Sequence, residues 1–346
     1  MNKYRKRFHS WHQKMTYIGK IGKGGKTVDN VRAARKAIDY RKRRSYIEFL
    51  YVLPFLLLVA AFAYFPLFGW IYSFYDYQPG KSLFAYKYTG FKWLMDMFAT
   101  DAKAERTTQV LKNTLAVSGI SLLFSWFPMM FAVFLNEVKC KTYRKFVQTA
   151  TTLPNFISWV LVYSVAFHLL YAANGPLNQV LKALGIIEES IDLMKDNNYM
   201  YLRMWLWLTW KNAGWAAIMY LAAIAAIDEQ MIEAAKVDGA TRMKIIWHIT
   251  IPSLLPTYFV IVTLNIANFL NNGMEQFYVF YNSFNSDYTQ VLDLYVYQKA
   301  FPPGSTSSTG NFPLATSISM LKSIVSLVLL TVANTASKLI RKESII

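Results

Sequence analysis

The sequence predicts an all-α polytopic membrane protein with six transmembrane helices and both termini in the cytoplasm. Of its 346 residues, 54% are hydrophobic and only 16% are charged, whereas a soluble chain carries about a quarter charged residues. The apolar residues gather in long runs, each near the roughly 20 residues that cross a hydrocarbon core as a helix. The basic residues gather ahead of the first run.

The spans follow from the apolar runs between charged segments. Interior prolines such as Pro54 and Pro128 are tolerated, because neighbouring helices can satisfy the carbonyls that a proline frees. The expected spans are Phe49–Phe74, Asn113–Leu135, Phe146–Tyr171, Tyr201–Ile227, Leu254–Asn272 and Leu314–Ile340.

A basic tail precedes these spans, so the chain divides into residues 1–45 and a transmembrane domain over 46–346. Residues 1–46 hold fifteen Lys and Arg against two acids. Such a segment beside apolar spans marks the cytoplasmic side and contacts anionic membrane lipid. Nucleic acid is the alternative partner, but nothing that resembles a nucleic-acid fold accompanies the tail. We therefore expect contact with lipid and none with nucleic acid.

The distribution of Lys and Arg sets the orientation. With the N-terminus inside, the cytoplasmic segments hold twenty-five basic residues and the outer segments eight. Without the tail the ratio is ten to eight, so the tail carries most of this inference. Both termini are therefore expected inside, together with the loop at about 228–252.

The tail contains the sequence GKGGKT at Gly22–Thr27, which invites a phosphate-loop interpretation. That motif needs a glycine five residues before Gly25, where this chain has Lys20, and it needs a preceding strand. We therefore expect no nucleotide and no other cofactor on this chain. Its single cysteine and four scattered histidines form no pattern of metal ligands, so no metal site is expected either.

The loop at about 228–252 predicts two short helices that meet at a glycine. Asp228 is a suitable N-cap for the helix-forming stretch EQMIEAAKV, and Gly239 suits the left-handed position that ends it. Thr241 can start a second helix, which Pro252 is expected to close near the membrane. Such an elbow either docks another protein or lies on the membrane surface, and its local pattern leaves both open.

The order of residues in this loop is more specific. The stretch EAAKVDGATRMKIIWHITIP resembles the EAA loop of binding-protein-dependent ABC importer permeases, although Ile251 stands where that pattern usually has Leu. The resemblance extends over about Tyr46–Lys342 and is nearest to maltose-type permeases and the subgroup that takes up complex oligosaccharides. The residues that match the motif, with its aspartate variant, are Glu233, Ala234, Ala235, Asp238, Gly239, Ile249 and Pro252.

This resemblance implies the type I ABC importer permease fold, in a multi-pass protein of the bacterial cytoplasmic membrane. It implies a non-catalytic subunit that works with a second homologous permease, two cytoplasmic ATPase subunits that bind ATP and Mg, and an extracellular solute-binding protein. The loop would sit in a cleft of an ATPase, where Glu233 would pair with a basic residue and Gly239 would permit the bend. A stand-alone secondary transporter or channel is the alternative, and it would have no use for this loop.

The fifth span carries a candidate path for the solute. Asn265, Asn268 and Asn272 fall on one face of a helix, and Gln276 extends that face. Carboxamides donate and accept hydrogen bonds at once, which suits sugar hydroxyls, but bonds between helices would serve them equally well. Gly273 is expected to end the helix, and Glu275 and Gln276 would then lie in a loop that lines the outer cavity.

Other side chains in the spans extend this path. Trp159 and Tyr163 offer stacking faces for sugar rings. A lysine at mid-membrane costs about 2.5–3.5 kcal/mol on insertion scales, so Lys322 is expected to meet an acid of the partner permease or an anionic sugar. Lys211 is expected near the start of the fourth span.

Overall fold

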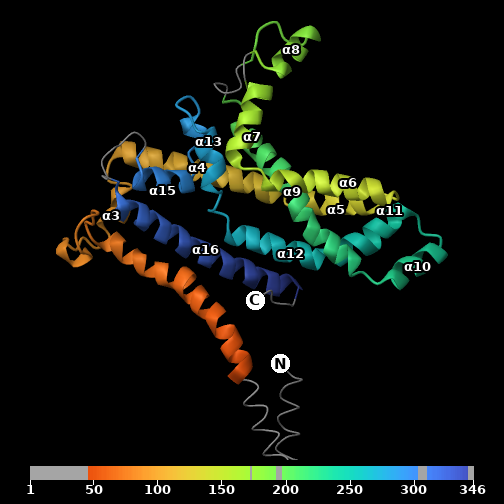
Figure 1. The fold of residues 1–346 in the computed structure, drawn as a ribbon, viewed down its shortest axis with the longest axis horizontal. Coiled ribbons are helices and arrows are strands. Elements are labelled where there is room, and N and C mark those ends of the chain that lie inside the picture. Colours follow the sequence, from red (N-terminus) through yellow and green to blue (C-terminus); the bar gives the residue numbers. More distant parts are fainter. Residues whose placement is uncertain (1–45, 172–173, 192–196, 303–309, 342–346) are drawn as a thin grey trace, which may run out of the picture. The chain divides into compact units, whose positions relative to one another are not determined.

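The computed structural model describes residues 46–171, 174–191, 197–302 and 310–341 (Figure 1). Within these ranges the regular structure is helical, with one isolated antiparallel β-bridge between Tyr75 and Tyr88. The basic tail, including Gly22–Thr27, lies outside the described residues. The chain divides into two units, residues 1–69 and 70–346, and each is described by itself.

The described part of the first unit is helical, and its helix runs from Tyr46 to Phe74, past the boundary between the units. It is α-helical at first, then forms the π-turn η1 (Ala60–Tyr64) and the 3-10 segment η2 (Phe65–Phe74). Its 29 residues have a mean hydropathy of 2.2, which is long and apolar enough for a span. The helix agrees with the span expected at Phe49–Phe74.

The second span is longer than the sequence predicted. After the short helix α3 (Lys92–Asp96) come α4 (Asp101–Leu123) and α5 (Phe127–Asn136), which together form one 36-residue candidate span. The helix begins at Asp101 rather than Asn113, because the Thr100 side chain caps it and accepts the backbone N–H of Lys103 at 3.4 Å. At 1.5 Å per residue it exceeds the bilayer core of about 30 Å.

The span expected at about Phe146–Tyr171 is not one continuous helix but a broken one. The segment comprises α6 (Lys141–Thr152), η4 (Leu153–Phe156), α7 (Trp159–Ala166) and η5 (Phe167–Tyr171). Its two halves meet at an angle of 105°. Ile157 between them has extended backbone angles, and the Ser158 hydroxyl caps α7 by accepting the N–H of Leu161 at 3.4 Å.

The fourth span, α9 (Met200–Ala225), lies at the centre of the second unit and agrees with the range expected from Tyr201. It follows the short helix α8 (Pro176–Ala183) and packs against α4, α5, α6 and α12. Gly214 permits the contact with α6, because a Cβ there would lie 2.2 Å from the carbonyl oxygen of Thr151. At its far end the chain turns by 70° into α10 (Glu229–Val237).

The fifth span begins earlier than expected. Helical turns continue through α11 (Arg242–Ile245), the π-turn η6 (Ile246–Thr250) and α12 (Ile251–Ala267). The expectation that Pro252 closes a separate short helix is therefore wrong. This proline lies just after the π-turn η6, inside the continuous helix Arg242–Ala267, and it does not end that helix.

The chain then forms three short helices and a last long one. These are α13 (Met274–Phe280), α14 (Ser286–Thr289), α15 (Leu292–Ala300) and α16 (Phe312–Arg341). The last helix covers the span expected at Leu314–Ile340 and packs against α3, α12 and α15. In Figure 1, α10 lies at one end of the second unit, and α13 and α15 lie toward the other.

The described residues hold four helices that are long and apolar enough to cross a membrane, or six if each bent pair forms one span. The buried core supports these helices in separate clusters. One cluster joins α4, α7, α9, α13 and α15 around Phe277 and Phe280. Another joins α5, α9, η6 and α12 around Tyr220 and Leu254.

Candidate functional site

The elbow predicted at about 228–252 is present at one end of α9 and α12. The carboxylate of Asp228 accepts the N–H of Gln230 at 2.9 Å and so caps α10. Gly239 has φ +79°, a left-handed conformation that glycine adopts without a steric cost. The N–H of Ala240 then bonds the carbonyl of Ala235 at 2.9 Å, which closes the helix end.

The elbow is anchored at one side and exposed at the other. Ile245 and Ile246 are buried, and Ile246 belongs to the core cluster of α5, α9 and α12. The motif residues Glu233, Ala234, Asp238, Gly239 and Pro252 are exposed, whereas Ala235 and Ile249 are half-buried. Large apolar side chains are exposed beside them, namely Met231, Val237, Met243 and Trp247. An apolar surface with flanking charges, fixed to a rigid core, is suited to contact with another protein.

A polar cavity of about 290 Å³ lies where α12 ends. It is lined by three of the predicted path residues, Asn265, Asn268 and Asn272. The expectation that one helix carries them is wrong, because α12 ends at Ala267. The turn after it nevertheless brings Asn272 to the same cavity. The remaining lining residues are Ser118, Ser121, Leu122, Leu208, Phe269, Asn271 and Gly273.

Only some of the polar atoms in the cavity wall have hydrogen-bond partners within the wall. The Asn272 amide donates to the Ser118 hydroxyl at 2.8 Å, and Ser118 donates to the carbonyl of Phe269. The Oδ1 of Asn272 and the hydroxyl of Ser121 are buried without a hydrogen-bond partner among the described residues. Buried polar atoms of this kind require a partner such as water or a ligand. The wall can therefore bind a polar molecule.

An ion pair between Lys322 and Asp293 lies next to the residues of this wall, and Asp293 is not the partner that the sequence suggested for Lys322. The Lys322 ammonium on α16 pairs with the Asp293 carboxylate on α15, and both side chains are 16% exposed. The other carboxylate oxygen accepts the backbone N–H groups of Asn272 at 2.9 Å and Gly273 at 3.1 Å. The acid that meets Lys322 in this structure belongs to its own chain.

The remaining path residues lie elsewhere. Glu275 and Gln276 lie in α13 rather than in a loop; Glu275 is exposed, whereas Gln276 is buried and donates to the carbonyl of Met204 at 2.7 Å. Trp159 and Tyr163 pack against the core cluster of α7, α9 and α13. These two aromatic residues and Gln276 do not line the polar cavity.

Lys211 has a structural role, and the expectation that it lies near the start of the fourth span is wrong. It lies in the middle of α9 with 7% of its surface exposed. Its ammonium donates to the carbonyls of Pro154, Asn155 and Ile157 at 3.2, 2.8 and 2.6 Å. These carbonyls lie where the third span breaks, so the lysine caps the helix end at that break.

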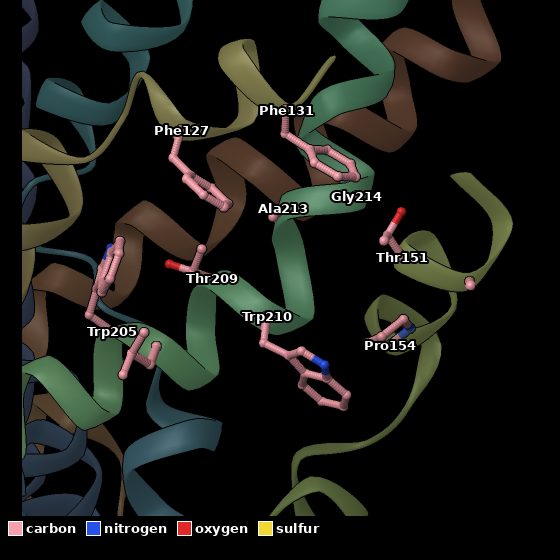
Figure 2. A pocket seen from close by; sticks show the side chains of 11 residues that line it. Phe127, Phe131, Thr151, Pro154, Trp205, Thr209, Trp210, Ala213 and Gly214 are labelled. Atoms are coloured by element: carbon pink, nitrogen blue, oxygen red, sulfur yellow. The ribbon is translucent and has the colours of Figure 1, made fainter. Parts of the chain in front are cut away.

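A second, apolar pocket of about 440 Å³ lies among α5, α6, η4 and α9 (Figure 2). Aromatic side chains line it, including Phe127, Phe131, Trp205 and Trp210. Its other lining residues are Ala150, Thr151, Pro154, Leu206, Thr209, Ala213 and Gly214. Because it offers few hydrogen-bonding groups, it is less suited to a sugar than the polar cavity at the end of α12.

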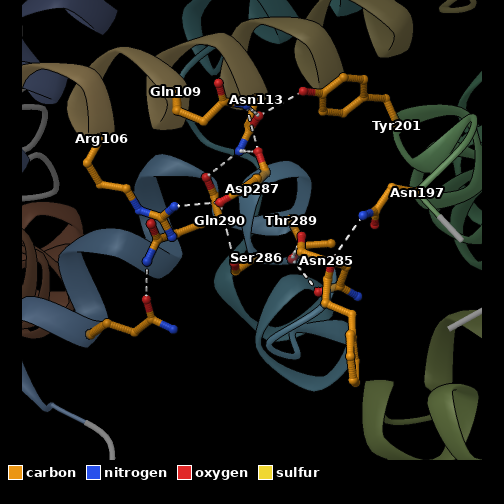
Figure 3. Close-up of polar contacts among 12 residues, drawn as sticks. Arg106, Gln109, Asn113, Asn197, Tyr201, Asn285, Ser286, Asp287, Thr289 and Gln290 are labelled. Atoms are coloured by element: carbon orange, nitrogen blue, oxygen red, sulfur yellow. Dashed lines mark hydrogen bonds and ion pairs between the residues drawn. The ribbon is translucent and has the colours of Figure 1, made fainter. Parts of the chain in front are cut away.

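A polar network fixes the loop that carries α14 (Figure 3). The buried Asn113 amide on α4 donates to the carbonyls of Asp287 and Gln290 at 2.9 and 3.0 Å, and it accepts from Tyr201 at 2.8 Å. Arg106 pairs with the Asp287 carboxylate at 2.9 Å. Sequence reasoning did not single out Asn113 or Asp293, because their partners are distant in the sequence and no spacing signals them.

Comparison with known proteins places the chain in a family. The family of the binding-protein-dependent transport system inner membrane component matches residues 125–343, more than half of the chain. The polygalacturonan/rhamnogalacturonan transport system permease protein YteP of Bacillus subtilis is 34% identical over 86% of this chain and 89% of its own length. The protein LplB of the same organism is 32% identical over 91% and 96%.

A solved structure is similar over nearly the whole chain. It is a bacterial alginate ABC transporter in complex with alginate pentasaccharide-bound periplasmic protein. The matched chain has a TM-score of 0.75 and 29% identity, covering 88% of this chain and 98% of that one. This chain is a multi-pass membrane permease, and it belongs to the family of binding-protein-dependent transport system inner membrane components.

Proposed function

We propose that this chain is the permease subunit of an ATP-driven importer that takes up an oligosaccharide or polysaccharide fragment. The proposal is supported by the family, by relatives whose names refer to the transport of rhamnogalacturonan, lactose and arabinooligosaccharides, and by the polar cavity. Carboxamides and hydroxyls in that cavity can match the hydrogen bonds of sugar hydroxyls.

The elbow is the observation that carries the ATP-driven part of the proposal. It presents Glu233 and Asp238 on a capped helix beside exposed apolar side chains. A separate ATPase subunit, which binds ATP and Mg, holds this helix in a cleft. Closure of two such ATPases moves the elbow, and the rigid connection to α9 and α12 transmits the movement to the cavity.

The coupling of the elbow to a cytoplasmic ATPase also sets the orientation of the chain in the membrane. The six spans comprise the four long helices, the broken third segment from α6 to η5, and α9, with both termini and the elbow in the cytoplasm of a bacterial cell. The loop around α14 then lies outside, where a second permease subunit and an extracellular solute-binding protein complete the importer. The alginate transporter, which was solved in complex with a periplasmic protein, supports that assignment by similarity.

The test combines purification with uptake. The tagged full-length chain, purified from its native cells, should copurify with an ATPase, and the complex should support ATP-dependent uptake of an oligosaccharide probe. We would offer trigalacturonate and maltotriose as an acidic and a neutral probe. Uptake by the chain alone, without ATP, would instead establish a stand-alone secondary transporter or channel.

Asn268→Leu tests the cavity. It lies at the end of α12 and lines the cavity, so we expect uptake to fall about tenfold or more while the assembled complex forms normally. Asn178→Leu is the comparison for a packing role, because Asn178 exchanges hydrogen bonds of 2.9 Å with the backbone of Ile191 and so packs a loop. We expect this variant to lose uptake and assembly together. Equal loss of uptake and assembly in Asn268→Leu would favour a packing role.

A further inference from the structure

Asn272 lies in an irregular segment, yet its amide is held in the cavity wall. The helix α12 ends at Ala267 and α13 begins at Met274, so Asn272 has no helical hydrogen bond to fix it. Gly273 follows with φ +78°. The two backbone N–H groups at this turn both point to one oxygen of Asp293. That carboxylate is therefore the acceptor that fixes the turn.

The carboxylate has a buried countercharge. Lys322 pairs with its second oxygen, and both side chains are largely removed from solvent. A buried carboxylate without a partner is strongly unfavourable, so the ammonium stabilises Asp293 where it can accept the two N–H groups. One ion pair thus ties together α15, α16 and the turn after α12.

We propose that Asp293 and Lys322 are positioning residues for the passage of the oligosaccharide, because together they hold Asn272 in the wall of the polar cavity. The inference rests on the proposed function in so far as the cavity binds the transported sugar. Asp293 acts through the backbone of Asn272 and Gly273, and Lys322 acts through Asp293. Neither lines the cavity itself.

A positioning role and a simple ion pair predict different results when the two charges are exchanged. Two N–H donors need an acceptor, and an ammonium offers only donors. Exchange of the two charges, in Asp293→Lys with Lys322→Asp, would therefore rebuild an ion pair but place a donor against the donors of Asn272 and Gly273. The neutral pair Asp293→Asn with Lys322→Met keeps an acceptor oxygen and leaves no unpaired charge.

The position of Asn272 can be measured without a sugar. The Asn272 amide and the Ser118 hydroxyl are 2.8 Å apart, so cysteines at these two positions should react together with a short bifunctional thiol reagent. The background is the full-length Cys140→Ser chain in its native membrane. The control pair replaces Asn155 and Asn212, which share a 2.9 Å hydrogen bond elsewhere in the unit.

We expect Asp293→Ala and the charge-exchanged pair to slow cross-linking of the 118/272 cysteines about tenfold or more, since two hydrogen bonds to a charged group are lost. The neutral pair should stay near the parent rate, and the 155/212 cysteines should react at the parent rate throughout. The inference is overturned if the exchanged pair restores cross-linking, if Asp293→Ala leaves it unchanged, or if both cysteine pairs slow together.

A separate measurement keeps this inference distinct from the proposed function. Asn272→Ala should raise the KM for uptake of trigalacturonate with little change in assembly, and it should remove the effect of Asp293→Ala on that KM. Additive effects would contradict positioning through Asn272. If Asn272→Ala leaves uptake unchanged while the cross-linking results hold, Asp293 and Lys322 still position this turn, but the cavity is not the sugar path.

Discussion

Two lysines of the long helices show how a buried charge can be accommodated within one chain. Lys322 meets a carboxylate, whereas Lys211 meets three backbone carbonyls at the break in the third span. Its ammonium also lies 5.5 Å from the centre of the Trp159 ring, within the range of a cation–π contact. Each lysine thus stabilises a place where a helix ends inside the bundle.

Lys211→Met should therefore destabilise the protein, because it leaves the carbonyls of Pro154, Asn155 and Ile157 without their donor. We expect a loss of about 2–4 kcal/mol, from the cost of unsatisfied buried acceptors. Thermal unfolding of the detergent-solubilised chain, followed by loss of the monodisperse peak, would measure it.

The matched control is Lys112→Met, the same chemical change at an exposed position of α4. It should unfold within a degree or two of the parent, since a single exposed substitution changes stability by only about 0.5 kcal/mol. Equal stability of the Lys211 and Lys112 variants would show that solvent or lipid headgroups can replace the ammonium at the break.

The sequence predicted which residues are unusual better than it predicted their partners. It identified Lys322 and the three asparagines as candidates, because charged and amide side chains are costly in lipid. It did not identify Asp293, which lies 29 residues before Lys322 in the short helix α15. Side-chain pairing across the fold leaves no spacing in the sequence. The asparagines share one cavity, as their spacing suggested, but through a turn after α12 that the helical pattern did not predict.

At the scale of elements, the elbow combines local signals that are sufficient to form it. Its N-caps, Asp228 and Thr241, and the glycine between its helices lie where the sequence predicted them. Each signal acts over a few residues, which is why sequence reasoning succeeds here. The break in the third span is different, because its carbonyls are satisfied by a lysine of another helix.

Glu233→Arg should abolish docking of the ATPase while the chain still inserts in the membrane. Glu233 is exposed on α10, so its loss costs the fold little, whereas an arginine would repel a basic partner residue. Copurification of the ATPase with the tagged chain measures docking. Glu229→Arg is the matched control, because it makes the same charge change on the same helix outside the motif, and it should copurify normally.

Gly239→Pro should give the same phenotype for a different reason. Proline fixes φ near −65°, whereas Gly239 has φ +79°, so the bend between α10 and α11 would be lost. Gly239→Ala should be milder, at about 1–2 kcal/mol of local strain. Normal assembly by both Glu233→Arg and Gly239→Pro would contradict the coupling role of the elbow.

At the scale of the whole molecule, the broken helices decide how many times the chain crosses the membrane. Length and composition select four spans. The other two require that the broken third segment crosses despite its bend, and that α9 crosses while α10 stays outside the membrane. The sequence predicted six because apolar content is insensitive to a bend. An even number of spans, four or six, places both termini on the same side, so the sidedness of one loop tests the orientation of the chain.

Cys140 provides that test without any engineering. It is a free, exposed cysteine at the N-cap of α6, in a segment predicted to be cytoplasmic, and the sequence contains no other cysteine. A membrane-impermeant maleimide should therefore leave Cys140 unlabelled in intact cells and label it after permeabilisation. Lys81→Cys in a Cys140→Ser background should label in intact cells, since that segment is predicted outside. Labelling of Cys140 from outside would reverse the orientation and would remove the elbow from the reach of a cytoplasmic ATPase.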